Sequence, residues 1–308
     1  MILKKLSNTY KTEGTKKTIL KILNHLAFKI KRIPLNVFLF LVPKNELGDK
    51  IFALREFIYY HKRFPSNKLY LNDFLYKIKT EELQNPERVF VSDKEFVKMY
   101  IKAKIGNKYN VPTIKILKNK NEIENYKFPT RCCIKSTHAS GHYILRSSGE
   151  VINKDQIKLW LKTNYYLQNR EKNYKYLEPK IIVEPLVFDQ MYPEDFKMFC
   201  YLGKVKMIQV DLNRHKNHKR LYFTKKWKKL NFSLRVPQAN VEFKKPYNLE
   251  EMIKISEKIA ADFNFIRVDL YSNGKTCFVG ELTNCHESAN ANFFPANSEQ
   301  WVSKQIFS

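Results

Sequence analysis

Near its carboxyl end the chain reads Phe265-Ile266-Arg267-Val268-Asp269-Leu270-Tyr271, and after a polar turn it continues as Thr276-Cys277-Phe278-Val279-Gly280-Glu281-Leu282-Thr283. Apolar and polar residues alternate through most of both segments, as they do in strands that bury one face. The residues between them include Asn273-Gly274, a pair that favours a tight turn. The sequence therefore predicts a β-hairpin with one apolar face.

The length of the turn decides which side chains of the hairpin share a face. A two-residue loop, Asn273-Gly274, would place Asp269 and Glu281 on opposite faces, because side chains alternate along a strand. A three-residue loop from Ser272 to Gly274, with the glycine in the left-handed conformation, reverses that parity. We predict the three-residue loop, which gathers four polar side chains on one surface: Arg267, Asp269, Glu281 and Thr283.

The polar face of this hairpin has the ligand chemistry of a magnesium site. Mg²⁺ takes hard oxygen ligands and usually shares them with phosphates. Glu281 is flanked by Val279 and Leu282, where an unpaired carboxylate would be costly. We therefore predict that Asp269, Glu281 and Thr283 bind the metal; the alternative is an ordinary solvated strand face.

A second candidate for binding phosphate lies upstream. Lys135 ends a predicted strand and precedes the small residues of His138-Ala139-Ser140-Gly141. Small residues let backbone N–H groups approach phosphate oxygens, and a lysine adds a point charge. The residues alone leave two interpretations open, a phosphate-binding loop and a structural turn.

The other segments indicate helices mixed with short strands. Ser92 and Glu95 have the spacing of a capping box for a helix that ends near Gly106. Asn248 and Glu251 predict the start of another helix, and a third is expected over 154–167. Strands are expected over 131–136, 143–146, 180–184, 196–201 and 205–211. This order predicts an α+β fold with antiparallel sheets.

Composition narrows the class of protein. The chain has 308 residues, 44% of them hydrophobic, which suffices for a sizeable core. Lys and Arg number 56 against 30 Asp and Glu, a net charge of +26. Such an excess favours a polyanionic partner: nucleic acid, an anionic membrane or an acidic glycan. The basic residues run along the whole chain without a nucleic-acid-binding motif, so nucleic acid is the less favoured partner, and compositional background is a further explanation.

The first 33 residues carry nine basic side chains and one acidic side chain. Apolar residues between Ile19 and Ile30 recur at helical spacing, which predicts a basic amphipathic helix. Such a helix lies on an anionic bilayer or packs against the rest of the protein. No apolar run is long enough to span a membrane. The five cysteines lack paired spacing, which indicates reduced thiols and no structural zinc. We expect a cytoplasmic protein, peripheral at the inner face of the cell membrane.

Taken together, these segments resemble the ATP-grasp superfamily, and most closely the TupA-like family of teichuronopeptide and capsule biosynthesis. The resemblance extends over about residues 70–284. It is carried by these segments of the sequence: Ser92-Asp93-Lys94, Ile134-Lys135-Ser136-Thr137-His138-Ala139-Ser140-Gly141, Ile181-Ile182-Val183-Glu184, Asp195-Phe196-Lys197-Met198-Phe199-Cys200, Val210-Asp211-Leu212-Asn213-Arg214, Phe265-Ile266-Arg267-Val268-Asp269-Leu270-Tyr271 and Gly280-Glu281-Leu282-Thr283.

The resemblance implies an ATP-grasp fold, in which two α+β lobes with antiparallel sheets grip ATP. It places a basic helical extension at 1–70, an amino-terminal lobe with the phosphate loop at 71–183, and a carboxyl-terminal lobe with the magnesium site at 184–308. ATP and Mg²⁺ are the implied cofactors.

The resemblance also implies a role for each matching residue. Two lysines would bind phosphate: Lys94 and Lys135. The loop that covers the phosphates would be His138, Ala139, Ser140 and Gly141. The hinge that meets adenine through its backbone would be Val183, Glu184, Pro185 and Leu186. Basic residues that face the γ-phosphate and the acceptor would be Lys197, Arg214 and Arg267. Asp269 and Glu281 would hold magnesium, with Thr283 where many ATP-grasp proteins have Asn.

The implied activity is ATP-dependent carboxylate–amine ligation through an acyl phosphate. Its expected substrates are an amino acid or another amine and a carboxylate, such as the uronic acid of a surface polysaccharide precursor. The chain departs from the family after Thr283, because residues 284–292 lack the usual glycine-containing loop. This departure leaves open a catalytically degenerate ATP-grasp protein that acts as a scaffold. The net charge of +26 and the 14% of aromatic residues leave open a basic nucleic-acid-binding protein.

Overall fold

The computed structural model describes residues 34–213 and 217–308. The predicted amphipathic helix within residues 1–33 and the predicted role of Arg214 lie outside these ranges. The chain divides into two compact units, Met1–Asn67 and Lys68–Ser308. The five cysteines are free and buried.

The described part of the first unit is a pair of helices, α2 (Leu35–Leu41) and α3 (Glu46–His61). The Asn45 side chain caps α3 by accepting a hydrogen bond from the backbone N–H of Gly48 at 3.0 Å. Phe38, Val42 and Phe52 form the small core of this pair. Within the described ranges, no helix combines the length and the apolar composition that crossing a bilayer requires.

The second unit begins with short helices that lead to α6. They are α4 (Leu71–Lys77), a π-helical turn (Ile78–Glu82), α5 (Pro86–Phe90) and α6 (Phe96–Ile105). The predicted capping box is wrong in detail. Asp93 caps α6, because its carboxylate accepts from the backbone N–H groups of Glu95 at 2.7 Å and Phe96 at 3.3 Å. Ser92 instead donates to the carbonyl oxygen of Arg88.

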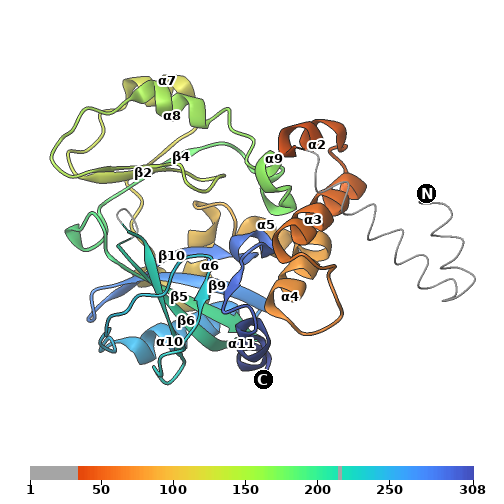
Figure 1. Cartoon of the computed structure of the whole chain (residues 1–308). Coiled ribbons are helices and arrows are strands. Elements are labelled where there is room, and N and C mark those ends of the chain that lie inside the picture. Colours follow the sequence, from red (N-terminus) through yellow and green to blue (C-terminus); the bar gives the residue numbers. More distant parts are fainter. Residues whose placement is uncertain (1–33, 214–216) are drawn as a thin grey trace, which may run out of the picture. The chain divides into compact units, whose positions relative to one another are not determined.

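A four-stranded antiparallel sheet forms the first lobe of this unit, with strand order β1-β4-β2-β3. Its strands are β1 (Lys115–Leu117), β2 (Cys132–Ser136), β3 (Tyr143–Arg146) and β4 (Ile181–Glu184). Helices α7 (Lys120–Asn125) and α8 (Lys154–Trp160) cover one face (Figure 1) and share a core with the sheet. The helix predicted over 154–167 is interrupted, since α9 (Tyr166–Asn169) follows separately.

A five-stranded antiparallel sheet forms the second lobe, with strand order β10-β9-β5-β6-β7. The strands are β5 (Glu194–Tyr201), β6 (Lys204–Leu212), β7 (Lys219–Thr224), β9 (Phe265–Ser272) and β10 (Cys277–Thr283). Helix α10 (Leu249–Ala260) packs on one face, whereas α4 and α11 (Ser298–Phe307) share a core with the other. A two-stranded ribbon joins β8 (Ser233–Leu234) to β11 (Phe293–Phe294). The predicted α+β class with antiparallel sheets is confirmed.

The β9–β10 hairpin brings its polar residues together by a different device from the predicted one. Ser272 pairs with Cys277, so the loop has four residues, Asn273 to Thr276, and not three. The register then shifts at a β-bulge between Val279 and Glu281, and Asp269 pairs with Glu281. One extra residue in a strand reverses the face on which the following side chains lie. The bulge therefore places Asp269 and Glu281 on the same face, which we had predicted that the turn would do.

Candidate functional site

A cavity of about 670 Å³ lies between the two sheets of the second unit. Residues from β2, β4, β5, β6, β9 and β10 line it, so neither sheet forms it alone. Most of the predicted site residues are among its lining residues: Lys94, Lys135, Ala139, Ser140, Gly141, Glu184, Pro185, Leu186, Lys197, Asp269 and Glu281.

Four predicted residues of the described chain do not line the cavity. His138 is buried, and its Nε2 lies 3.2 Å from the carbonyl oxygen of Trp160. Val183 is buried in the core of the first lobe. Arg267 and Thr283 lie behind Asp269, where they contact each other. These positions give His138 and Val183 a supporting role in packing, whereas Arg267 is one contact away from the cavity.

Lys94 ties the small-residue loop to the second lobe. Its Nζ donates to the carbonyl oxygen of Ala139 at 2.6 Å, and its backbone N–H donates to the carbonyl oxygen of Thr137 at 3.1 Å. Burial lowers the pKa of Lys94, and the nearby ammonium of Lys135 lowers it further, although Glu281 opposes the shift. The structure therefore brings two cations and the loop 139–141 to the same wall of the cavity.

Lys135 is held by a buried carboxylate on the neighbouring strand. Its Nζ lies 2.9 Å from Glu184 Oε2, and Glu184 Oε1 lies 2.5 Å from the Nζ of Lys98. Burial alone would raise the pKa of Glu184, but the two ammonium groups outweigh it and the net shift is downward. Glu184 is therefore a carboxylate shared between two lysines, a role that the resemblance did not imply.

Lys197 lies among three aspartates on the floor of the cavity. Its Nζ contacts Asp195, lies 3.0 Å from Asp269 Oδ2 and 3.7 Å from Asp211 Oδ2. The strand registers cause this arrangement, because Asp195 pairs with Asp211 and Lys197 pairs with Asp269. Although burial opposes it, the aspartates raise the pKa of Lys197. The floor is therefore a set of alternating charges.

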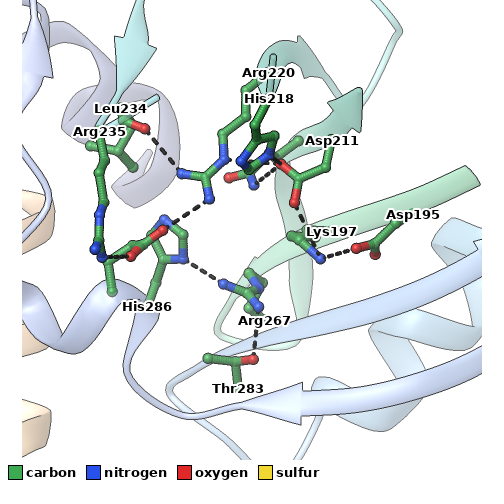
Figure 2. Close-up of polar contacts among 12 residues, drawn as sticks. Asp195, Lys197, Asp211, His218, Arg220, Leu234, Arg235, Arg267, Thr283 and His286 are labelled. Carbon is green, nitrogen blue, oxygen red and sulfur yellow. Dashed lines mark hydrogen bonds and ion pairs between the residues drawn. The ribbon is translucent and has the colours of Figure 1, made fainter. Parts of the chain in front are cut away.

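Arg267 lies behind these charged residues and binds Asp269. Its guanidinium donates to both carboxylate oxygens of Asp269, from Nε and Nη2 at 2.6 Å each, and to Thr283 Oγ1 at 2.9 Å. Figure 2 shows that the same guanidinium also meets Nδ1 of His286. Asp269 is buried, yet Arg267 and Lys197 overcome the effect of burial and lower its pKa to about 2. It is therefore a carboxylate that stays ionised.

The hairpin carboxylates fit a magnesium ion by their donor chemistry. Asp269 and Glu281 are cross-strand partners that line one cavity, and Glu281 is 43% exposed in its side chain. Among the described residues, no group of three or more His, Cys, Asp or Glu side chains is arranged to hold a metal ion unaided. Magnesium commonly uses one or two protein carboxylates together with water and substrate phosphates, and the two hairpin carboxylates have that chemistry.

Several residues of the site were not predicted. Asp195 and Asp211 lie in segments quoted for the resemblance but received no role. Arg220 lies on β7, a strand that was not predicted, and it binds both Asp211 and Glu287 at 2.9 Å. A charged residue directly before the apolar run Leu221-Tyr222-Phe223 was the available signal. His286, for which no partner was predicted, contacts Arg267.

Comparisons with known proteins place this arrangement in a family. No curated protein matches the chain. Among solved structures it is similar to D-alanine–D-alanine ligase from Helicobacter pylori (15% identity, 71% of this chain and 58% of that one, TM-score 0.39). It is also similar to the ATP-grasp ligase PsnB complexed with a minimal precursor (10%, 72% and 63%, 0.38) and to D-alanine–D-alanine ligase from Bacillus anthracis (15%, 70% and 67%, 0.38).

The chain thus spans 58% and 63% of the first two of these relatives. The TM-scores are below 0.5, so these similarities by themselves do not define the family. The decisive match is to the TupA-like ATPgrasp family, whose model matches residues 75–307. This range contains both sheets, the cavity and every described residue that the resemblance singled out, and we conclude that the chain belongs to the TupA-like ATP-grasp family.

Proposed function

We propose that the protein is an ATP-dependent, ADP-forming ligase that joins a carboxylate to an amine through an acyl phosphate. The observation that supports this most strongly is the composition of the cavity between the two sheets. Three lysines from both lobes, the small-residue loop and the two hairpin carboxylates line it together: Lys94, Lys135, Lys197, Ala139 to Gly141, Asp269 and Glu281. Cations on several sides of a cavity suit a triphosphate, and the carboxylates suit its metal.

The proposed reaction has two steps. In the first, a carboxylate oxygen of the substrate attacks the γ-phosphorus of ATP, the bond to the β-phosphate oxygen breaks, and ADP leaves. In the second, the amine nitrogen attacks the carbonyl carbon of the acyl phosphate, inorganic phosphate leaves, and the nitrogen loses a proton. The first step is needed because a carboxylate is a poor electrophile and an acyl phosphate is a good one.

The residues of the chain would serve these steps by position and charge. Lys94, Lys135 and Lys197 would neutralise phosphate oxygens, since each ammonium already lies at the cavity wall. Arg267, which does not line the cavity, would act through Asp269 by keeping its carboxylate ionised and in place. Magnesium held by Asp269 and Glu281, with Thr283 beside them, would supply Lewis-acid polarisation of phosphate oxygens. The loop over 139–141 would exclude water from the acyl phosphate.

The substrate class is inferred by analogy with the family. A uronic acid of a surface polysaccharide precursor is the proposed carboxylate, and an amino acid or another amine is the proposed acceptor. The excess of positive charge suits an acidic glycan. A peripheral position at the inner face of the cell membrane, through residues 1–33, is proposed with it.

The experiment that tests the proposal measures ADP and phosphate release from Mg·ATP with a panel of uronic acids and amino acids. Release that requires one acid and one amine together is the expected result. Glu281→Gln should abolish that release with little loss of stability, because the Glu281 side chain is 43% exposed. Full turnover by Glu281→Gln would contradict the site assignment. ATP binding without turnover for any substrate pair would favour the degenerate scaffold.

A further inference from the structure

Residues 287–289 form a turn of unusual backbone conformation directly after the hairpin. Glu287, Ser288 and Ala289 have φ angles of 50°, 56° and 64°. These values lie in the left-handed region, which residues with a side chain rarely adopt. Such residues persist only where the surrounding structure holds them, and they cluster at functional sites. The contacts of this turn show what holds it and which residue it orients.

The side chains of the turn hold it in place. Glu287 binds Arg220 through Oε1 at 2.9 Å and binds Arg235 through Oε2. Ser288 Oγ accepts a hydrogen bond from the buried Nζ of Lys79 at 2.7 Å. Glycine would suit the backbone at both positions but would lose all of these contacts. The chain therefore uses side chains with specific partners where conformational freedom alone would have sufficed.

The residue that precedes the turn, His286, faces Arg267. His286 is 1% exposed, and its Nδ1 receives the Nη1–H of Arg267 (Figure 2). Because Nδ1 accepts, the imidazole is neutral and carries its proton on Nε2. Burial and the neighbouring guanidinium hold the pKa of His286 well below its usual range. The imidazole and Asp269 thus fix the guanidinium on different sides.

A second path leads from the turn to the cavity. Arg220 joins Glu287 to Asp211, and Asp211 faces Lys197, which binds Asp269. Figure 2 shows the part of this path that leads from Arg220 through Asp211 to Lys197. The turn is thereby connected to Asp269 from two directions, through His286 and Arg267 and through Arg220 and Lys197. A displacement of the turn would therefore move Asp269 through Arg267, through Lys197 or through both.

We propose that Glu287 and Ser288 are positioning residues. They hold the turn so that the neutral imidazole of His286 keeps the Arg267 guanidinium against Asp269, which lines the cavity. The role of Arg267 in this inference rests on the proposed ligase function. The geometry of the turn does not depend on that function, so an experiment can refute the positioning role or the ligase function without refuting the other.

The first test is spectroscopic and needs no activity. Long-range proton–nitrogen correlation spectra report the tautomer of each histidine, and His286→Gln assigns the signal. In the wild-type protein His286 should remain neutral with Nε2 protonated from about pH 8 down to about pH 5. Glu287→Gln should replace that signal by a mixture of tautomers. The control is Glu257→Gln, which removes a carboxylate of α10 that pairs with Lys204 and Lys225, and it should leave the signal unchanged. An unchanged His286 signal in Glu287→Gln would overturn the proposal.

The second test is a double-mutant cycle on ADP formation. Glu287→Gln should lower kcat about tenfold or more with little change in the KM for ATP, since a displaced Arg267 moves Asp269 and so misaligns the reacting groups in the chemical step. In an Arg267→Lys background the same change should cost nothing further. Independent, multiplicative losses would overturn the positioning role. A wild-type protein without ADP formation would refute the ligase function, and the spectra would still decide the inference.

Discussion

Asp269 shows what a buried charge requires in this protein. It is 4% exposed, and Arg267 and Lys197 together occupy both of its oxygens. Removing one partner of such a set leaves the others buried and uncompensated, which commonly costs about 3–5 kcal/mol. Asp269→Asn is therefore expected to impair stability as well as turnover. Glu281→Gln is the cleaner probe of chemistry, because its side chain is only half-buried.

The same contacts predict how stability depends on pH. The pKa of Asp269 falls from its ordinary value of 3.8 to about 2 in the folded protein. A lowered pKa contributes stability that is complete above the unfolded value and is lost as the pH falls through the folded value. We expect wild-type stability to fall between about pH 4 and about pH 2, with about 2 kcal/mol of the loss due to Asp269.

Urea unfolding at a series of pH values measures this. The difference in unfolding free energy between wild type and Asp269→Asn should shrink as the solution is acidified, because protonated Asp269 no longer attracts its partners. A difference that stays constant down to about pH 2 would show that Asp269 titrates normally.

At the scale of elements, the bulge in β10 depends on a glycine. A Cβ atom on Gly280 would lie 2.8 Å from Cε2 of Tyr271 and 3.2 Å from its Cζ. Gly280→Ala should therefore push the Tyr271 ring aside and destabilise the protein by about 1–3 kcal/mol. The effect should be smaller when Tyr271→Ala is already present, and denaturant unfolding of the four proteins gives the coupling. Additive losses would mean that the ring is not the obstacle.

The start of α6 gives a second prediction at this scale. Asp93 caps the helix and also lies 3.3 Å from the buried Nζ of Lys180. Asp93→Ala loses a cap and leaves part of a buried charge unbalanced, so we expect a loss of about 3 kcal/mol. Asn119→Ala, which removes an exposed cap of α7, should cost only about 1 kcal/mol. Equal losses in thermal or urea unfolding would contradict this account of Asp93.

At the scale of the whole molecule, the positive charge is unevenly divided between the two units. Met1–Asn67 carries 14 basic and 4 acidic residues, against 42 and 26 in the much longer Lys68–Ser308. Basic residues near an anionic membrane surface contribute about 1 kcal/mol each. The first unit is thus the part of the chain best suited to an anionic bilayer.

A truncated protein tests this division. Residues 68–308 contain the whole family match and the cavity, so we expect them to fold alone and to bind Mg·ATP. Sedimentation with vesicles of phosphatidylcholine and phosphatidylglycerol should show salt-sensitive binding by the full chain and none by the truncated one. Equal binding by both would refute a membrane role for the first unit.

Local pattern was sufficient for much of the fold. Strands β2, β3 and β4 lie close to where their apolar runs predicted them. β2 and β4 are buried, and consecutive apolar residues are typical of such strands. Strand β7 escaped prediction although its centre is buried, because the short apolar run from Leu221 to Phe223 does not by itself distinguish a strand from a buried helix. Asn248 does not cap α10, because its side chain accepts from Ser272 Oγ, a residue distant in sequence.

Short segments predicted some residues of the candidate site, whereas segments distant in sequence determine how those residues are arranged. Short segments of the sequence were enough to predict Asp269, Glu281, Lys135 and the loop 139–141 as candidate site residues, because the order of polar and apolar residues within each segment indicates which side chains share a face. The same segments did not predict which residues these side chains contact. The register of three strands, β5, β6 and β9, sets Lys197 among three aspartates. A bulge aligns Asp269 with Glu281, and a turn of left-handed residues orients His286 toward Arg267. Registers, bulges and turns depend on the packing of distant segments, and only the tertiary structure fixes them.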